Sequence, residues 1–156
     1  MTVAEVIGLL NDLSNLTGEI KTVPDEGSLL PETYFFTYGT SRQALLDRMQ
    51  QQREMELIEA WVDRSADLPL RTPQEAVILA SIVELETGDS EDRREVAGVF
   101  VNRLRSGMRL QSDPTVLYGV DGNPSRPIRK SDLKRQTAWN TYFIKGLPQT
   151  AICNPS

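Results

Sequence analysis

Apolar positions at helical spacing predict helices along most of the chain. Thr2-Val-Ala-Glu5 has the form of a capping box, and the apolar residues that follow it predict an amphipathic helix that ends near Gly18. Residues 19–39 break this pattern with two prolines and an apolar, aromatic tail. They predict an irregular or extended segment that packs against the rest of the chain.

A second capping pattern, at Thr40 and Gln43, predicts a long helix that ends near Ala66. We expect its polar run around residue 51 to face solvent. Its core face should consist of the apolar residues at helical spacing, which are Leu45, Met49, Met55, Leu57, Ile58 and Trp61.

The clearest helix start in the chain is Thr72-Pro-Gln-Glu75, with a threonine N-cap and a proline at the first helical position. It predicts a helix over residues 73–87, which Gly88 ends. Ser90 then caps a further helix that ends at Gly107, and the short connection predicts that the two helices are antiparallel. Later residues predict short extended pieces and a short segment capped by Ser131. The fold class is therefore mainly α, or α+β with only short extended segments, in a single helical domain.

The helix over residues 73–87 carries two carboxylates, Glu84 and Glu86, at its own C-terminal end. The negative end of the helix dipole and apolar neighbours disfavour the charged form of a carboxyl group there, as a general acid requires. At about 100° per residue, the two side chains point about 200° apart and cannot share one function on one face. Glu86 extends the line of Ile78 and Ile82 toward the core side of a cleft, whereas Glu84 lies over small residues such as Ala80. The simpler alternative is that both are solvated residues of a last turn.

Composition narrows the chemistry that is available. The chain has 156 residues, no histidine and one cysteine, Cys153, which excludes the usual nitrogen and sulfur metal sites and all histidine-based catalysis. We expect no cofactor and no metal. A formal net charge of −5 gives no global basic field for nucleic acid, and no apolar run approaches the roughly 20 residues of a membrane span. Chemistry must run on carboxylates, hydroxyls, amides or cations.

Polar side chains crowd around Pro114, where Gln111, Ser112, Asp113 and Thr115 follow one another closely. Such an edge can hydrogen-bond sugar hydroxyls and amides. For Asp113 alone, we favour the interpretation that it is the N-cap of a segment that begins with Pro114.

Aromatic and amide side chains form two further groups. Tyr118, Trp139 and Tyr142 could line a saccharide cleft, although isolated aromatic residues in a helical domain more often belong to the core. Asn102 and Asn140 interrupt apolar neighbourhoods, so each is either a buried hydrogen-bond organiser or a substrate contact.

Six blocks of sequence carry a family pattern as well as a structural one: Glu26-Gly-Ser-Leu-Leu-Pro-Glu-Thr-Tyr34, Ala80-Ser-Ile-Val-Glu-Leu-Glu-Thr-Gly88, Val99-Phe-Val-Asn-Arg-Leu104, Met108-Arg-Leu-Gln-Ser-Asp-Pro-Thr-Val-Leu-Tyr-Gly119, Trp139-Asn-Thr-Tyr142 and Gly146-Leu-Pro148. In this order they resemble the YceG-like endolytic murein transglycosylases, over residues 24–150. The resemblance implies cleavage of peptidoglycan glycan strands between N-acetylmuramic acid (MurNAc) and N-acetylglucosamine (GlcNAc), which leaves 1,6-anhydro-MurNAc ends. One glutamate would act first as acid and then as base.

The resemblance also implies roles for particular residues. Glu86-Thr-Gly88 resembles the Glu-Ser-Gly step that carries the acid in other lytic transglycosylases, so we prefer Glu86 over Glu84 as the catalytic residue. From the chemistry of their side chains, the residues that we expect to contact the substrate are Gln111, Ser112, Asp113, Thr115, Tyr118, Asn140 and Tyr142. A local basic patch could meet the acidic stem peptides of peptidoglycan, but a solvated face is the simpler interpretation; it comprises Arg126, Arg129, Lys130, Lys134 and Arg135.

The resemblance further implies how the chain is organised and where it acts. Residues 1–23 would be a lead-in helix and linker at the end of a preceding LysM-like region. Residues 24–156 would be the catalytic domain, truncated at its C-terminus, with a lysozyme-like cleft around the helix 73–87. We expect a bacterial inner-membrane protein whose anchor is absent from this chain and whose catalytic domain lies in the periplasm. Peptidoglycan synthases would be its partners.

Two other functions remain open from the sequence. A hydrolytic glycosidase would use Glu84 or Asp113 as a second carboxylate beside Glu86. A non-catalytic binding or scaffold module of the cell-wall synthesis machinery would use neither glutamate for chemistry.

Overall fold

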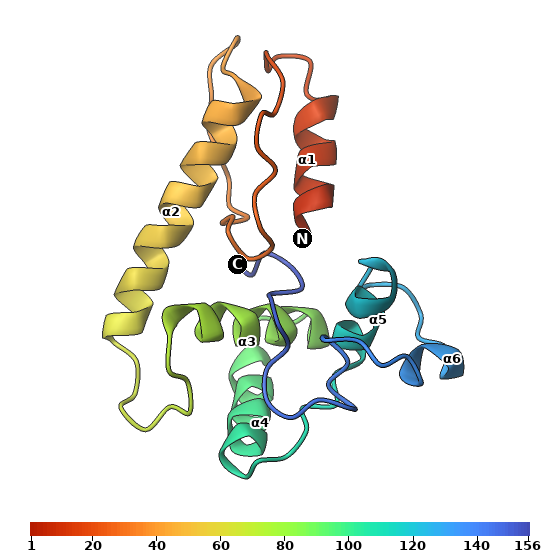
Figure 1. Cartoon of the computed structure of the whole chain (residues 1–156). Helices are drawn as coiled ribbons and strands as arrows, with labels where there is room; N and C mark the ends of the chain where they lie inside the picture. The colour runs from red at the N-terminus through yellow and green to blue at the C-terminus, as the bar shows by residue number, and fades with distance from the viewer.

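The computed structural model covers residues 1–156 and contains six helices and no strand. The only β-type contact is an isolated bridge between Thr17 and Ser41. The prediction of a mainly α fold is therefore confirmed. The helices, shown in Figure 1, are α1 (Val3–Asp12), α2 (Arg42–Val62), α3 (Pro73–Glu86), α4 (Arg93–Arg105), α5 (Asp113–Asp121) and α6 (Lys130–Leu133).

The capping signals place the first and third helices correctly. Thr2 Oγ1 accepts a hydrogen bond from the Glu5 amide at 3.3 Å, and the Glu5 carboxylate accepts one from the Thr2 amide at 2.7 Å. Thr72 caps α3 in the same way, through the amide of Glu75. However, α1 ends at Asp12, well before Gly18, because the chain turns there and the Thr17 amide bonds the carbonyl of residue 40 at 2.9 Å.

Two predictions for α2 are wrong. Its N-cap is Ser41 rather than Thr40, and Gln43 instead accepts hydrogen bonds from the amides of residues 21 and 22. Met55 and Ile58 were predicted in the core but are each 56% exposed. Leu45 and Met49 are buried because only the first half of α2 packs against α1 and the segment that follows it.

The fourth helix also differs from its prediction. It begins at Arg93 with Asp92 at the N-cap position, because residues 87–92 form a turn in which side chains bond the backbone. The Asp89 amide donates to Thr87 Oγ1 at 3.1 Å, and the Glu91 amide donates to Asp89 Oδ1 at 2.9 Å. This turn lets α4 cross α3 steeply instead of running back along it, so the predicted antiparallel arrangement is wrong (Figure 1).

The hydrophobic core is divided between two regions. The N-terminal region packs α1 against the start of α2, and the larger region surrounds α3. Since α1 shares its core with residues after position 24, residues 1–23 pack as part of this fold. The boundary at residues 23 and 24 stays a prediction. The buried cluster around α3 comprises Leu70, Leu79, Ile82, Val83, Phe100, Leu110 and Ile152.

The C-terminal segment joins these two regions. Asn154 Oδ1 accepts hydrogen bonds from the backbone amides of Gly27 and Leu29, each at 3.0 Å. The backbone amide of Asn154 donates to the carbonyl of Met1 at 2.7 Å. Both termini therefore lie near the middle of the molecule (Figure 1). Burial raises the pKa of the neighbouring Cys153 thiol to about 12, so this thiol remains a protonated core group.

Candidate active site

The two glutamates at the end of α3 line separate pockets. Glu86 lines a pocket of about 260 Å³ whose other walls come from α4 and from Gln111. Glu84 lines a pocket of about 340 Å³ between α3, α4 and the C-terminal residues. The two pockets have no lining residue in common. The divergence expected from their helical spacing is therefore realised in the structure.

Glu84 is held in place by its neighbours. Its carboxylate pairs with Arg93 Nη2 at 3.0 Å, and Ser156 Oγ donates to it at 3.2 Å. Only 19% of the Glu84 side chain is exposed. Of the small residues beneath it, Ala80 lines the same pocket, while Ser81 is buried and donates its hydroxyl proton to the Ile78 carbonyl. These contacts fit an ion pair that connects α3 to α4.

Glu86 is the last residue of α3 and its side chain is exposed. Ile78 and Ile82, on the same line of the helix, are buried. The helix ends immediately after Glu86, where the Thr87 amide bonds the Val83 carbonyl at 3.3 Å. The line of residues therefore leads out of the core and into the pocket, and the Glu86 carboxylate is free to meet a ligand.

Gln111 lines the same pocket as Glu86 and has an unusual backbone conformation. Its φ of 54° makes it the only residue other than glycine with a positive φ. A glutamine in this left-handed region costs about 1–3 kcal/mol, which the surrounding structure must offset. The backbone amide of Gln111 donates to the Thr141 carbonyl at 3.2 Å, and the side chain of Gln111 is exposed. Such strain is often found where a side chain must point at a ligand.

A buried hydroxyl network holds this strained turn. The Ser112 amide donates to Thr141 Oγ1 at 2.9 Å, and the hydroxyls of Thr115 and Thr141 lie 2.8 Å apart. Thr115 Oγ1 also donates to the Ser112 carbonyl at 2.6 Å. Ser112 and Thr115, both predicted as substrate contacts, have no exposed surface in this structure. They support the turn that presents Gln111.

Asp113 and Tyr142 form the next pair along the site. Tyr142 donates its hydroxyl proton to Asp113 Oδ1 at 2.7 Å. Burial, the hydrogen bond to Asp113 and the negative charges of Asp113 and Glu86 raise the pKa of Tyr142 to about 12. The predicted N-cap role of Asp113 is wrong, because α5 begins at Asp113 itself and Ser112 occupies the N-cap position.

Asn140 organises the loop that carries Tyr142. It is fully buried, and its side-chain nitrogen donates to the carbonyls of Leu133 at 3.3 Å and Arg135 at 2.6 Å. Its Oδ1 accepts a hydrogen bond from the Tyr142 amide at 3.0 Å. Of the two roles left open for it, the structure favours the buried organiser. Asn102, by contrast, is exposed on α4.

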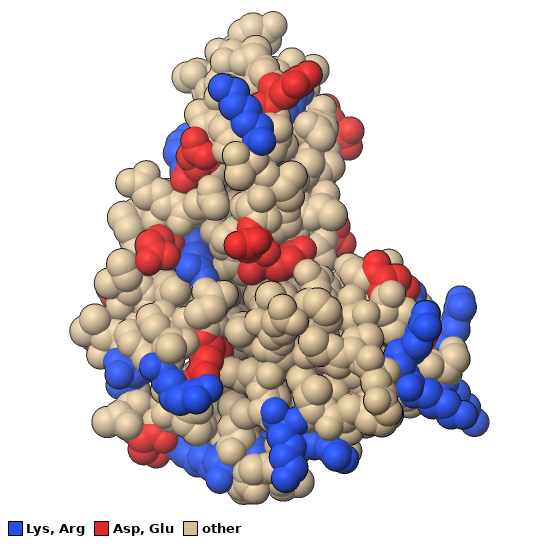
Figure 2. Space-filling view, viewed as in Figure 1, with Lys and Arg blue, Asp and Glu red and all other residues tan.

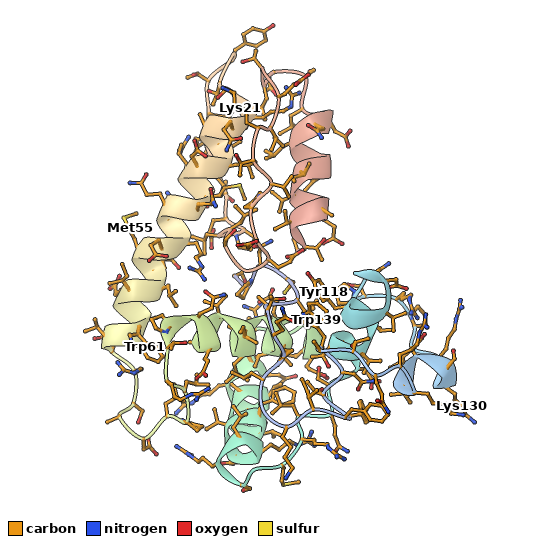
Figure 3. All side chains as sticks on the ribbon, viewed as in Figure 1. Lys21, Met55, Trp61, Tyr118, Lys130 and Trp139 are labelled. Atoms are coloured by element: carbon orange, nitrogen blue, oxygen red, sulfur yellow. The ribbon has the colours of Figure 1, made fainter.

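The aromatic pair Tyr118 and Trp139 belongs to the core around α3 (Figure 3). The two rings meet edge to face, with their centroids 5.8 Å apart. Trp139 Nε1 donates to Thr150 Oγ1 at 2.9 Å, and burial raises the pKa of Tyr118. Neither ring lines the Glu86 pocket. The aromatic residue that lines this pocket is Phe100.

Residues of α4 in the pocket were missed as site residues at the sequence level. Val96, Val99, Phe100 and Arg103 all line it. They follow one another at helical spacing, so Arg103 could have been found as the polar end of an apolar stripe. Arg103 Nη1 donates to the Leu110 carbonyl, which fixes the guanidinium beside the turn at Gln111. No three cysteine, aspartate or glutamate side chains are grouped to hold a metal ion.

The comparisons with known proteins agree on one family. The model of the YceG-like family matches residues 1–156. An endolytic murein transglycosylase of Bacillus subtilis is 34% identical over 132 residues, which cover 84% of this chain and 36% of that protein. One from Streptococcus pneumoniae is 33% identical over 137 residues, which cover 84% and 24%.

A solved structure extends the agreement to the fold. The crystal structure of a YceG-like protein from Listeria monocytogenes matches 99% of this chain and 51% of its own, with a TM-score of 0.72 and 30% sequence identity. The chain spans about a third or less of the length of the curated relatives it matches. On its sequence and its fold, this chain belongs to the YceG-like family.

Proposed function

We propose that this chain carries the catalytic site of an endolytic peptidoglycan lytic transglycosylase, with Glu86 as its single acid and base. The observation that supports Glu86 most strongly is the contrast between the two pockets. Glu84 is already paired with Arg93, while Glu86 opens into a pocket lined by Gln111 and Arg103. The relatives named endolytic murein transglycosylase support the substrate and the reaction.

The proposed reaction breaks the bond between C1 of MurNAc and the glycosidic oxygen that joins it to GlcNAc. Protonated Glu86 donates its proton to that oxygen, and the GlcNAc-bearing strand leaves as an alcohol. The Glu86 carboxylate then takes the proton of the 6-hydroxyl of the same MurNAc, whose oxygen attacks C1. The product is a 1,6-anhydro ring, and Glu86 is protonated again. The cycle consumes no water and needs no second catalytic carboxylate.

The surroundings of Glu86 supply the other functions that this reaction needs. Gln111 can hydrogen-bond sugar hydroxyls and the acetamido group, and Arg103 adds a positive charge to the wall of the same pocket. A two-carboxylate hydrolase is less well supported. Glu84 lies in the other pocket, and Asp113 accepts the hydroxyl proton of Tyr142.

The substrate also suggests where the protein works. Peptidoglycan lies outside the cytoplasmic membrane, so we propose extracytoplasmic action, anchorage at the inner membrane through a segment outside these residues, and peptidoglycan synthases as partners. Among the six helices, none has both the length and the hydropathy to cross a bilayer.

The test is a product analysis in water enriched in ¹⁸O. Purified glycan strands are digested with the longest protein that contains these 156 residues, and the new ends are identified by mass spectrometry. The proposal predicts 1,6-anhydro-MurNAc ends without ¹⁸O. Reducing ends that contain ¹⁸O would instead indicate a hydrolase, and folded protein that binds strands without cutting them would indicate a binding module.

A further inference from the structure

A strongly basic segment projects from an otherwise acidic molecule. Residues 126–135, called the basic segment below, contain five arginine or lysine residues and one aspartate, although the whole chain has a net charge of −5. Figure 2 shows the blue side chains gathered on the projection that carries α6, at the right of the molecule. Cations concentrated in this way raise the local concentration of anionic ligands.

Arg126 pairs with two carboxylates, one at the end of α5 and one inside the segment. Arg126 Nε donates to Asp121 Oδ2 and Arg126 Nη1 to Asp132 Oδ2, each at 2.7 Å. Asp132 is only 6% exposed and also accepts a hydrogen bond from the Arg129 amide at 2.9 Å. Arg126 therefore fixes the shape of the segment. The remaining four cationic side chains are exposed and form no ion pair in the structure: Arg129, Lys130, Lys134 and Arg135.

The basic segment is joined to the candidate active site by a short chain of contacts. The carbonyls of Leu133 and Arg135 accept hydrogen bonds from Asn140, and Asn140 accepts one from the Tyr142 amide. Tyr142 in turn bonds Asp113, and its pKa is influenced by the charge of Glu86. Backbone contacts thus connect the segment that carries the four free cations to Tyr142, whose pKa the charge of Glu86 influences.

We propose that the basic segment binds the carboxylates of the stem peptides that peptidoglycan strands carry on their MurNAc residues. This inference rests on the proposed function, because the peptide reaches the segment as a substituent of the sugar in the Glu86 pocket. The stem peptide is a short acidic chain, and the four exposed, unpaired cations of the basic segment complement its charge. The contact selects peptide-bearing strands over strands from which the peptides have been removed.

The experiment compares the two kinds of strand. Binding is measured by fluorescence anisotropy in a Glu86→Gln background, at about 50 mM and about 500 mM salt, since exposed charge pairs weaken with ionic strength. We expect the background protein to prefer peptide-bearing strands by roughly three- to tenfold at low salt. Lys130→Glu with Lys134→Glu should abolish this preference.

The matched control is Lys21→Glu with Arg94→Glu, which changes the net charge equally at two other exposed, unpaired cations. Lys21 and Lys130 lie at far-apart ends of the molecule (Figure 3). The control should keep the preference for peptide-bearing strands. Equal loss in both variants would overturn the inference, because the effect would then be one of net charge alone.

Two further outcomes would also overturn the inference. One is equal affinity of the background protein for both kinds of strand. The other is tighter binding through Lys130 and Lys134 to anionic lipid vesicles than to peptide-bearing strands, which would make the segment a membrane contact. Cleavage of both strand types by the wild-type protein is followed in parallel. Anhydro ends without a preference for peptide-bearing strands would support the proposed function and refute only the inference. A preference that depends on Lys130, without anhydro ends, would refute the proposed reaction and support peptide binding by the segment.

Discussion

The two pockets at the end of α3 differ in how the protein treats the same functional group. On one side, Glu84 is 19% exposed and its charge is matched by Arg93 at 3.0 Å. On the other, Glu86 is exposed, forms no ion pair and lies near a strained turn at Gln111. The carboxylates are two residues apart in sequence. Their separation across the helix places one of them in an ion pair and leaves the other exposed.

The two sides also differ in how they contribute to the stability of the fold. The Glu84 side contains an ion pair that joins two helices, whereas the Glu86 side contains a residue held at positive φ by a buried hydroxyl network. Strain that surrounding contacts must offset is typical of sites that hold a side chain toward a ligand. Substitutions on the two sides should therefore separate activity from stability.

The largest expected effect is on catalysis by Glu86→Gln. Removing the proposed general acid and base should lower the rate of anhydro-end formation by about 10³-fold, with little change in the free energy of unfolding. Glu84→Gln should keep the rate within about tenfold but lower stability, because it leaves Arg93 without its partner. The rates come from mass spectrometry and the stabilities from urea denaturation. The reverse pattern would move the acid to Glu84.

Thr141→Val should be the most destabilising change in the support of the strained turn. It keeps the shape of the side chain but leaves the buried Ser112 amide without its acceptor, at a cost of about 2 kcal/mol. Activity should fall as well, because Gln111 loses its fixed position. Denaturant unfolding measures the first effect and the cleavage rate the second. Lost stability with full activity would mean that the site does not depend on this hydroxyl network.

Tyr142→Phe should cost about 1.5 kcal/mol near neutral pH, by removing the hydrogen bond to the Asp113 carboxylate. It should also change how stability depends on pH. Because the pKa of Tyr142 is raised to about 12 in the folded state, its contribution is complete below pH about 10 and is lost as the pH rises through 12. The stability difference between wild type and Tyr142→Phe should therefore shrink above pH about 10. A constant difference would contradict this assignment.

Gln111→Gly should act on stability and activity in opposite directions. Glycine adopts positive φ without strain, so the free energy of unfolding should rise by about 0.5–1 kcal/mol. The cleavage rate should nevertheless fall about tenfold, because a sugar contact is lost. Gln111→Asn serves as a control that tolerates the same backbone and keeps an amide. Unchanged activity in Gln111→Gly would remove Gln111 from the site.

The smallest effect expected is the coupling energy between Glu84 and Arg93. A double-mutant cycle with Glu84→Gln and Arg93→Gln should give about 0.5–1 kcal/mol, because the pair is only partly buried. The value should fall at high salt. A coupling near zero at low salt would mean that Glu84 is not held by this pair, and would weaken the contrast between the pockets.

Local signals predicted the start of several elements well, since they depend on neighbouring residues alone. The caps at Thr2 and Thr72 are examples. The predictions failed where the contacts of a residue in the folded chain determine its position. Ser90 lost the N-cap position to Asp92 because the turn bonds its own backbone, and Met55 is exposed because no element packs on that side of α2.

The candidate site could be predicted only in part for the same reason. Helical spacing separated Glu84 from Glu86, and the divergence survives in the structure. Spacing could not show that Arg93 would reach Glu84, or that Gln111 would adopt a positive φ. The burial of Asn140 also depends on the return of the chain from α6, which no local pattern encodes.

The most direct test of the contrast between the two pockets is a crystal structure of the Glu86→Gln protein with a bound peptidoglycan glycan fragment. We expect the glycosidic oxygen of the fragment to lie within hydrogen-bond distance of the substituted side chain, with a sugar against Gln111. The pair between Glu84 and Arg93 should remain intact. A fragment seated in the Glu84 pocket, with that pair broken, would contradict the assignment of Glu86 as the acid.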